Sequence, residues 1–160
     1  MAIRIRVDTD ADFEALYRLD QECYEPGIAY SRRTLRAFLL EPGVFCRIAE
    51  ETAGHQAGDL LGFVIAQQHR RQGHIITLDV PVAHRRRGIG SLLLRDAEQR
   101  LAEAGVREIG LETAVDNSPA VAFWQKHGYC NCGVLKRYYA GTTDAFSMIK
   151  ILSDSIAAKS

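Results

Sequence analysis

Six consecutive residues, Arg85-Arg86-Arg87-Gly88-Ile89-Gly90, stand between a segment with the pattern of a β-strand and one with the pattern of a long α-helix. The strand, residues 74–80, is followed by Pro81, which cannot donate to a sheet ladder and therefore directs the chain out of the sheet. A helix that begins at these glycines leaves backbone N–H groups unpaired at the positive end of its dipole. We therefore expect an anion-binding turn, where the glycines let a pyrophosphate approach the amides and the arginines neutralise its charge.

Other interpretations of this segment are weaker. A solvated helix end is one alternative, although cations at a helix N-terminus oppose the dipole unless an anion binds there. A dinucleotide-binding fold would have a third glycine where Leu93 stands, and too few residues follow for a doubly wound sheet. The Gly-Lys-Ser/Thr of a P-loop is absent, and a nucleic-acid patch would be longer and interleaved with aromatic residues.

The remaining segments predict a single α/β domain. Apolar patterns bounded by turn residues predict strands at residues 3–7, 44–49, 60–66, 74–80, 109–113, 129–135 and 145–152. Helical spacing and capping signals predict a helix ending near Tyr24, a second capped by Ser31, a third from Ile89 to Gly105, and a fourth begun by Ser118-Pro119. We expect the order β-α-α-β-β-β-α-β-α-β-β, in a mostly antiparallel, seven-stranded mixed sheet flanked by about four helices. The domain would cover residues 1–152, followed by a polar tail at residues 153–160.

Composition limits the partners of such a domain. Lys plus Arg and Asp plus Glu each number 20, so no overall charge favours nucleic acid or an anionic membrane. No apolar run approaches the length of a membrane span, and residues 1–10 lack the apolar segment of a secretion signal, which favours a cytoplasmic location. The four cysteines do not have zinc-ligand spacing, so we expect no metal.

The arginine-glycine segment resembles the coenzyme A signature of the GNAT acetyltransferase superfamily, Gln/Arg-x-x-Gly-x-Gly/Ala. The resemblance covers nearly the whole chain and includes Leu111-Glu112, Asn117, Ala122-Phe123 and Gly128-Tyr129. Within the superfamily the chain is most similar to the ribosomal-protein-alanine N-acetyltransferases and related enzymes that acetylate protein amino termini. Tyr138-Tyr139, after the basic Lys136-Arg137, supports that branch.

The resemblance implies acetyl-CoA as co-substrate and a set of residues around it. The backbone of β-strand residues would meet the pantetheine arm like an added strand, and the turn would hold the pyrophosphate. The implied cofactor-binding residues are Leu78, Asp79, Val80, Arg85, Arg86, Arg87, Gly88, Ile89, Gly90, Ser91, Asn117 and Trp124. Asn117 has the alternative role of a helix cap.

The resemblance also implies catalytic roles. Glu112 matches the general base that takes a proton from the amine through water, although a solvent-facing strand glutamate is the plainer interpretation. Backbone N–H groups near Val80 would stabilise the developing oxyanion. Trp124 stands where the family usually has a tyrosine that protonates the departing thiolate, a role that indole cannot fill. Tyr138, Tyr139 or water would then supply that proton, and Trp124 would pack against the core or the pantetheine.

We expect the acceptor to bind between two loops. Tyr24, Glu25 and Tyr30 from the first interhelical loop, with Tyr138 and Tyr139 from a predicted hairpin loop, would frame a groove for a peptide amino terminus. The predicted function is transfer of an acetyl group by direct attack in a ternary complex to the α-amino group of a protein or peptide. A small amine as acceptor, and a domain that binds acetyl-CoA without catalysis, remain as alternatives. Both a monomer and a homodimer remain open.

Overall fold

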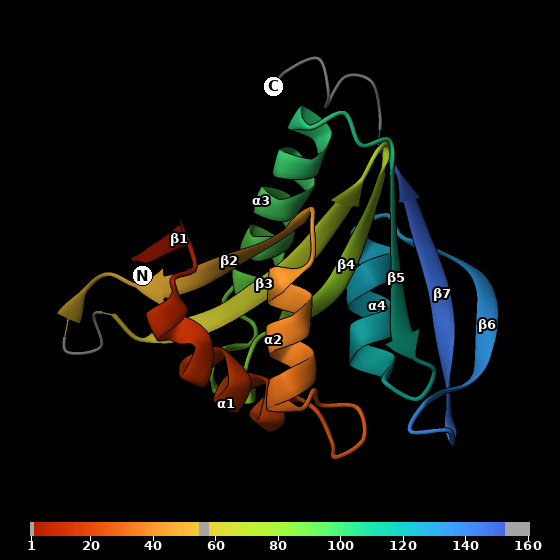
Figure 1. Ribbon diagram of the computed structural model, residues 1–160, viewed down its shortest axis with the longest axis horizontal. Coiled ribbons are helices and arrows are strands. Elements are labelled where there is room, and N and C mark those ends of the chain that lie inside the picture. The colour runs from red at the N-terminus through yellow and green to blue at the C-terminus, as the bar shows by residue number, and fades with distance from the viewer. Residues whose placement is uncertain (1, 55–57, 153–160) are drawn as a thin grey trace.

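The computed structural model describes residues 2–54 and 58–152, so the predicted tail at residues 153–160 lies outside the described residues. Within that part of the chain, seven strands form one sheet in the order β1-β2-β3-β4-β5-β7-β6, and four α-helices flank it (Figure 1). The strands are β1 (Ile3–Val7), β2 (Val44–Glu51), β3 (Leu60–His69), β4 (Gln72–Asp79), β5 (Glu108–Ala114), β6 (Cys130–Tyr139) and β7 (Thr143–Ile151). The helices are α1 (Phe13–Cys23), α2 (Arg32–Leu40), α3 (Ile89–Glu103) and α4 (Ser118–Lys126). The predicted fold class and order of elements are confirmed.

Each face of the sheet has its own apolar core, because successive strand residues point to opposite faces. Helices α3 and α4 cover one face, where Leu93, Leu101 and Trp124 belong to one cluster with Leu111 and Met148 of the sheet. Helices α1 and α2 cover the other face over β2 and β3 (Figure 1). Strand β3 is buried from both sides over Leu61–Ala66 and contains only apolar residues there, whereas its last three residues are polar and more exposed.

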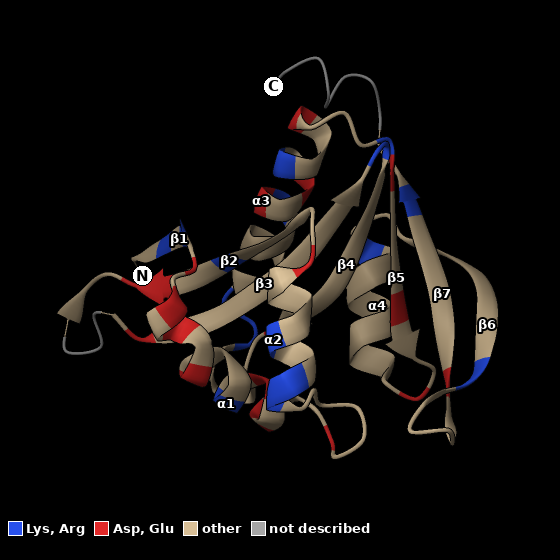
Figure 2. Ribbon diagram, viewed as in Figure 1, with Lys and Arg blue, Asp and Glu red and all other residues tan. Residues whose placement is uncertain are grey.

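Charge is spread over the surface of this domain. In the view of Figure 2, α1 and α3 carry both basic and acidic residues, whereas the charged residues of α2 are all basic. This distribution agrees with the equal numbers of acidic and basic residues in the sequence.

Two predicted details are wrong. Strand β6 continues to Tyr139, so Tyr138 and Tyr139 lie at the end of a strand and not in a hairpin loop. Between the pairs Leu135–Ala145 and Tyr139–Thr143 the register of β6 and β7 shifts, and Arg137 has a positive φ of 53°. A bulge therefore keeps this polar segment at the edge of the sheet. Helix α4 is capped by Asn117 rather than Ser118.

Gly62 on β3 permits close packing beside the end of β4. A Cβ atom at this position would lie 2.7 Å from the carbonyl oxygen of Asp79 and 3.3 Å from Cδ1 of Leu93 on α3. The first distance is shorter than any real Cβ contact, so β4 or α3 would have to move.

We predict that Gly62→Ala lowers the free energy of unfolding by about 1–3 kcal/mol, because it overpacks the joint between β3, β4 and α3. Gly110→Ala on β5 is the matched control, since its Cβ would meet nothing closer than the Met148 carbonyl oxygen at 3.8 Å. We expect a change of about 0.5 kcal/mol or less for the control in urea denaturation. Equal losses for the two variants would contradict this packing.

Candidate active site

The site begins where β4 and β5 part. These two strands are the parallel pair of the sheet, and only Gln72–His74 of β4 pairs with Glu108–Gly110 of β5. Figure 1 shows the strands meeting beside the β3–β4 hairpin and diverging toward their carboxyl ends. Beyond His74, the edge of β4 that faces β5 is therefore open over five residues, Ile75 to Asp79. An open pocket of about 330 Å³ lies along the start of this fork, lined by residues of β3, β4, β5 and β7.

His74 and Glu112 face each other in the pocket. The Nε2 atom of His74 lies 2.8 Å from Oε1 of Glu112, and the two side chains are 40% and 21% exposed. An ionised carboxylate only accepts hydrogen bonds, so this contact places a hydrogen on Nε2 of His74. Nδ1 of a neutral imidazole is then left as an acceptor.

Tyr138 completes this cluster from the edge strand. Its hydroxyl donates to the same Glu112 oxygen at 3.3 Å, and its ring packs edge-on against Tyr139 with ring centroids 4.9 Å apart. Burial and the neighbouring Glu112 carboxylate raise the pKa of Tyr138 above its usual value. Burial likewise raises the pKa of Tyr139, so both phenols keep their protons at neutral pH.

The loop between α1 and α2, residues 24–31, is fastened to the open edge of β4; we refer to it as the acceptor loop. The Tyr24 hydroxyl donates to the carbonyl oxygen of Leu78 at 3.1 Å, and the Tyr30 hydroxyl donates to that of Ile76 at 3.3 Å. Burial raises the pKa of both phenols. Glu25 is exposed on the same loop. The predicted acceptor residues Tyr24 and Tyr30 thus lie against the predicted cofactor strand.

The arginine-glycine turn connects β4 to α3, and its three arginines have different contacts. Arg85 donates through Nε to the carbonyl oxygen of Val80 at 2.8 Å. Arg87 donates through Nη2 to Oε2 of the buried Glu51 at 3.0 Å. Arg86 is exposed and has a positive φ of 67°. Arg85 and Arg87 therefore fix the turn, and Arg86 presents its charge to solvent.

The two glycines of the turn also differ. Gly88 caps α3 with a φ of 78°, a left-handed conformation, and its Cβ would meet no atom within 4 Å. A Cβ on Gly90 would instead lie 3.2 Å from the Phe123 ring of α4. Gly88 thus leaves the helix N-terminus accessible, whereas Gly90 lets α3 pack against α4. Ser91 in the same turn contacts Nε2 of His127 through its hydroxyl at 2.9 Å.

Asn117 and Trp124 have structural contacts. The side chain of Asn117 accepts from the backbone N–H of Ala120 at 3.2 Å and so caps α4. Trp124 is buried and packs edge-on against Phe123 and Tyr129. The interpretation of Trp124 as a packing residue is therefore supported by its contacts, and a role for either residue toward the cofactor stays a prediction.

His74 was missed by sequence reasoning. The residue lies inside an apolar strand pattern, and its contact with Glu112 depends on the register in which His74 pairs with Gly110. A histidine within an otherwise apolar strand was the available signal. Among the described residues, no group of three His, Cys, Asp or Glu side chains is placed to hold a metal ion. No helix among them is long and apolar enough to cross a membrane.

The mixed sheet with its parallel fork, followed by a glycine turn and a helix, makes an α/β domain with an open strand edge beside a helix N-terminus. The chain belongs to the GNAT acetyltransferase family, since the sequence profile described as "Acetyltransferase (GNAT) family" matches residues 13–129. It is 30% identical over 145 residues to N-alpha-acetyltransferase 30 of Dictyostelium discoideum, covering 88% of this chain and 74% of that protein.

Two further similarities agree with the predicted branch. The chain is 37% identical over 94 residues to N-alpha-acetyltransferase 30 of Schizosaccharomyces pombe, covering 56% of this chain and 63% of that protein. It thus spans less than two thirds of that relative's length. A chain in the crystal structure of the NatC complex bound to Gag peptide and CoA superposes with a TM-score of 0.80 at 27% identity, covering 96% of this chain and 100% of that one. The predicted resemblance of this chain to protein N-terminal acetyltransferases is confirmed by these sequence and structural similarities.

We predict that Asn117→Ala lowers the free energy of unfolding by about 1 kcal/mol, because α4 loses its cap. Asn117→Ser retains a capping oxygen and should recover most of that loss in the same urea denaturation. Two variants of equal stability would contradict the cap. Weaker acetyl-CoA binding by Asn117→Ser, which keeps the cap, would separately identify a cofactor contact.

Proposed function

We propose that this chain is an acetyl-CoA-dependent N-acetyltransferase that modifies the α-amino group of a protein or peptide N-terminus by direct attack in a ternary complex. The observation that carries the proposal is the His74–Glu112 pair at the β4–β5 fork, 2.8 Å apart and beside the open edge of β4. The family and the similarity to N-alpha-acetyltransferases support the choice of reaction and acceptor.

The residues at the fork fit an acetyl-CoA site. Leu78 and Asp79 at the end of β4, and Val80 just after it, would offer backbone groups to an extended pantetheine arm. The N-terminus of α3 has amides and the Arg86 charge for a pyrophosphate. When bound there, acetyl-CoA supplies an acetyl thioester as the electrophile. Arg85 and Arg87 act on this site by holding the turn through Val80 and Glu51.

The His74–Glu112 pair would take the proton of the acceptor amine. An α-amino group has a pKa of about 7.7–8.0, so a large part of it is protonated at neutral pH and cannot attack. Glu112 lies in the fork with its second partner, Tyr138, and is the proton acceptor directly or through water. His74 orients the Glu112 carboxylate and offers Nδ1 as a second acceptor.

The acceptor loop and the end of β6 would form the two walls of the peptide groove. Tyr24 and Tyr30 form the wall nearest β4, and Tyr138 and Tyr139 form the other. Glu25, exposed on the loop, would attract the ammonium group of the arriving peptide. Because Trp124 cannot protonate the leaving thiolate, Tyr138, which keeps its proton at neutral pH, is the proposed donor. Tyr139 and water are the other candidate donors.

The proposed setting is the cytoplasm, with the chain as a monomer or homodimer that binds neither nucleic acid nor membranes. Support comes from the balanced charge and from the four free thiols among the described residues. Light scattering coupled to size-exclusion chromatography distinguishes the two oligomeric states.

We predict that Glu112→Gln lowers kcat/KM for a peptide by about 10²–10⁴-fold, with little change in the KM for acetyl-CoA. The glutamine carbonyl still accepts the hydrogen of His74 Nε2, so the substitution removes the charge and keeps the contact. Glu103→Gln at the exposed end of α3 is the control and should have wild-type rates. Activity of Glu112→Gln within threefold of wild type, with an unchanged pH profile, would overturn the assignment.

The acceptor class is tested by the products formed from a mixed library of peptides and small amines. We expect mass spectra to show a gain of one acetyl group at peptide N-termini, with matching release of coenzyme A. Acetylation of small amines only would favour a small-molecule acetyltransferase. Tight acetyl-CoA binding without release would favour a binding module.

A further inference from the structure

Two aspartates lie buried together behind the acceptor loop. Asp20 is in the last turn of α1, Asp79 is the last residue of β4, and both are 0% exposed. Burying an ionised carboxylate is costly unless it is paired with a cation or fully hydrogen-bonded. The contacts of these two residues show how that cost is met.

One oxygen of each carboxyl group has an ordinary donor. The backbone N–H of Tyr30 donates to Oδ2 of Asp20 at 2.7 Å, and the Thr77 hydroxyl donates to Oδ1 of Asp79. The other two oxygens, Asp20 Oδ1 and Asp79 Oδ2, are the buried side-chain atoms of the described residues that no donor reaches. Other hydrogen bonds bring the two groups to the same place: Asp20 holds the backbone of Tyr30, and the Tyr30 and Tyr24 hydroxyls reach the carbonyl oxygens of Ile76 and Leu78, close to Asp79 along β4. The Asp20 carboxyl also raises the pKa of Asp79. A hydrogen bond between the two groups requires a hydrogen that two carboxylates do not have.

We propose that Asp20 and Asp79 share one proton as a carboxyl–carboxylate pair, and that this hydrogen bond fastens the acceptor loop to β4. The proton gives each unsatisfied oxygen a partner and reduces the buried charge of the pair from two to one. Neither residue touches the His74–Glu112 pair in this arrangement, so both are positioning residues.

The surroundings favour retention of the proton. Burial and the neighbouring Asp20 carboxyl raise the pKa of Asp79 well above its usual value, and Thr77 opposes this only in part. The other titratable side chains that interact with Asp79 have pKa values raised by burial and are therefore neutral; they are Cys23, Tyr24, Tyr30 and Cys46. Of the charged groups near Cys23, Glu22 raises the pKa of its thiol and Arg85 lowers it.

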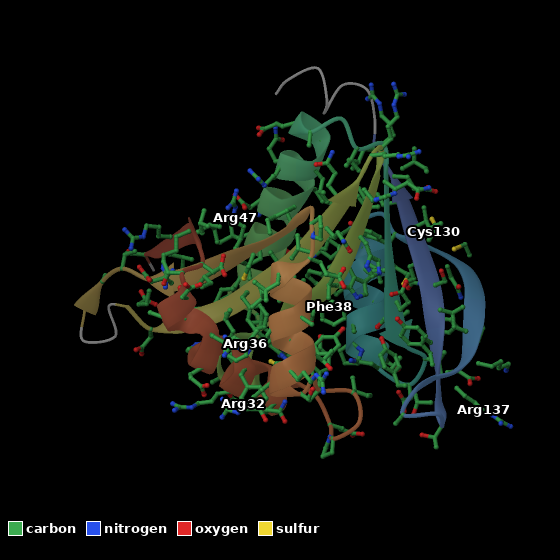
Figure 3. The ribbon with its side chains drawn as sticks, viewed as in Figure 1. Arg32, Arg36, Phe38, Arg47, Cys130 and Arg137 are labelled. Carbon is green, nitrogen blue, oxygen red and sulfur yellow. The ribbon has the colours of Figure 1, made fainter. Side chains whose placement is uncertain are left out.

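The pair has direct consequences for the loop. Asp20 holds the backbone of Tyr30, whose ring packs edge-on against Phe38 of α2 with centroids 5.1 Å apart. Phe38 is labelled beside α2 in Figure 3. The Tyr30 and Tyr24 hydroxyls then reach the carbonyl oxygens of Ile76 and Leu78 on β4. The loop is thus tied to β4 near both of its ends by the two phenols, and through Asp20 by the shared proton. That this loop binds the acceptor rests on the proposed function.

The shared proton is tested without any measurement of activity, by comparing the unfolding equilibrium constants of wild type and Asp79→Asn from pH 5 to pH 8. An asparagine amide donates the same hydrogen bond to Asp20 without titrating. Because the pKa of Asp79 is raised in the folded state above about 3.9 in the unfolded chain, its contribution to stability is complete below pH 4 and is lost as the pH rises toward the folded-state pKa. The ratio of the wild-type to the Asp79→Asn unfolding constant should therefore rise about tenfold per pH unit until that pKa is reached.

The control for this titration is Asp144→Asn, since Asp144 is hydrogen-bonded at the surface and its pKa is lowered. Asp144 is ionised in both the folded and the unfolded chain above pH 5. The ratio of the wild-type to the Asp144→Asn unfolding constant should therefore be constant from pH 5 to pH 8. An equally constant ratio for Asp79→Asn, or one that falls with pH, would overturn the shared proton and indicate an unseen donor such as buried water.

The role of the pair in holding the loop is tested with Asp20. Asp20→Ala removes both the acceptor of the Tyr30 N–H and the partner of Asp79, and should raise the peptide KM about tenfold or more with little change in the KM for acetyl-CoA. Asp20→Asn keeps an acceptor and a donor and should restore most of the peptide affinity. Equal KM values for the two variants, or a parallel rise in both KM values, would overturn the positioning role. Absence of any acetyl transfer by wild type would count against the proposed function, and the unfolding titration would still stand.

Discussion

The short pairing between β4 and β5 is the constraint on which the rest of the structure depends. Three residues of each strand share a ladder, and the strands then separate. A parallel pair that parts leaves backbone N–H and C=O groups on both exposed edges, and these groups need partners. The open edge of β4 is therefore a site for hydrogen-bonding ligands in the middle of an otherwise continuous sheet.

The chain fills only part of that edge with its own side chains. Two tyrosine hydroxyls of the acceptor loop donate to carbonyl groups of β4, and Asp20 accepts from the backbone N–H of Tyr30 behind them. On the β5 side, His74 and Glu112 meet where the ladder ends. The turn that follows β4 delivers the N-terminus of α3 to the same region. The proposed proton acceptor, the proposed anion site and the acceptor loop thus all lie beside the part of β4 that β5 leaves unpaired.

Features encoded over a few residues were predicted well from the sequence. Pro81, the glycines of the turn, the cap at Ser31 and the apolar face of α3 act within one or two helical turns, so local patterns suffice for them. The order of elements follows from these signals and from the alternation in the strands.

Features that depend on register or on distant partners were not predictable in the same way. The extension of β6 to Tyr139 relies on a bulge at Arg137, where a polar segment would normally predict a loop. The contacts of Arg85 with Val80 and of Arg87 with Glu51 depend on the folded turn and were not predicted, and the role of either arginine toward a phosphate stays a prediction. The His74–Glu112 and Asp20–Asp79 pairs join residues 38 and 59 positions apart, and only the assembled sheet brings them together.

We propose that the fork between β4 and β5, with the turn that follows it, holds acetyl-CoA. Titration of the isotopically labelled protein with acetyl-CoA, followed by amide NMR spectra, tests this binding site. We expect the largest shift changes at the amides of Leu78, Val80, Gly88, Ile89 and Gly90, with small changes along β1 and β2. Saturable shifts centred away from the fork, or none at these amides, would contradict binding at the fork.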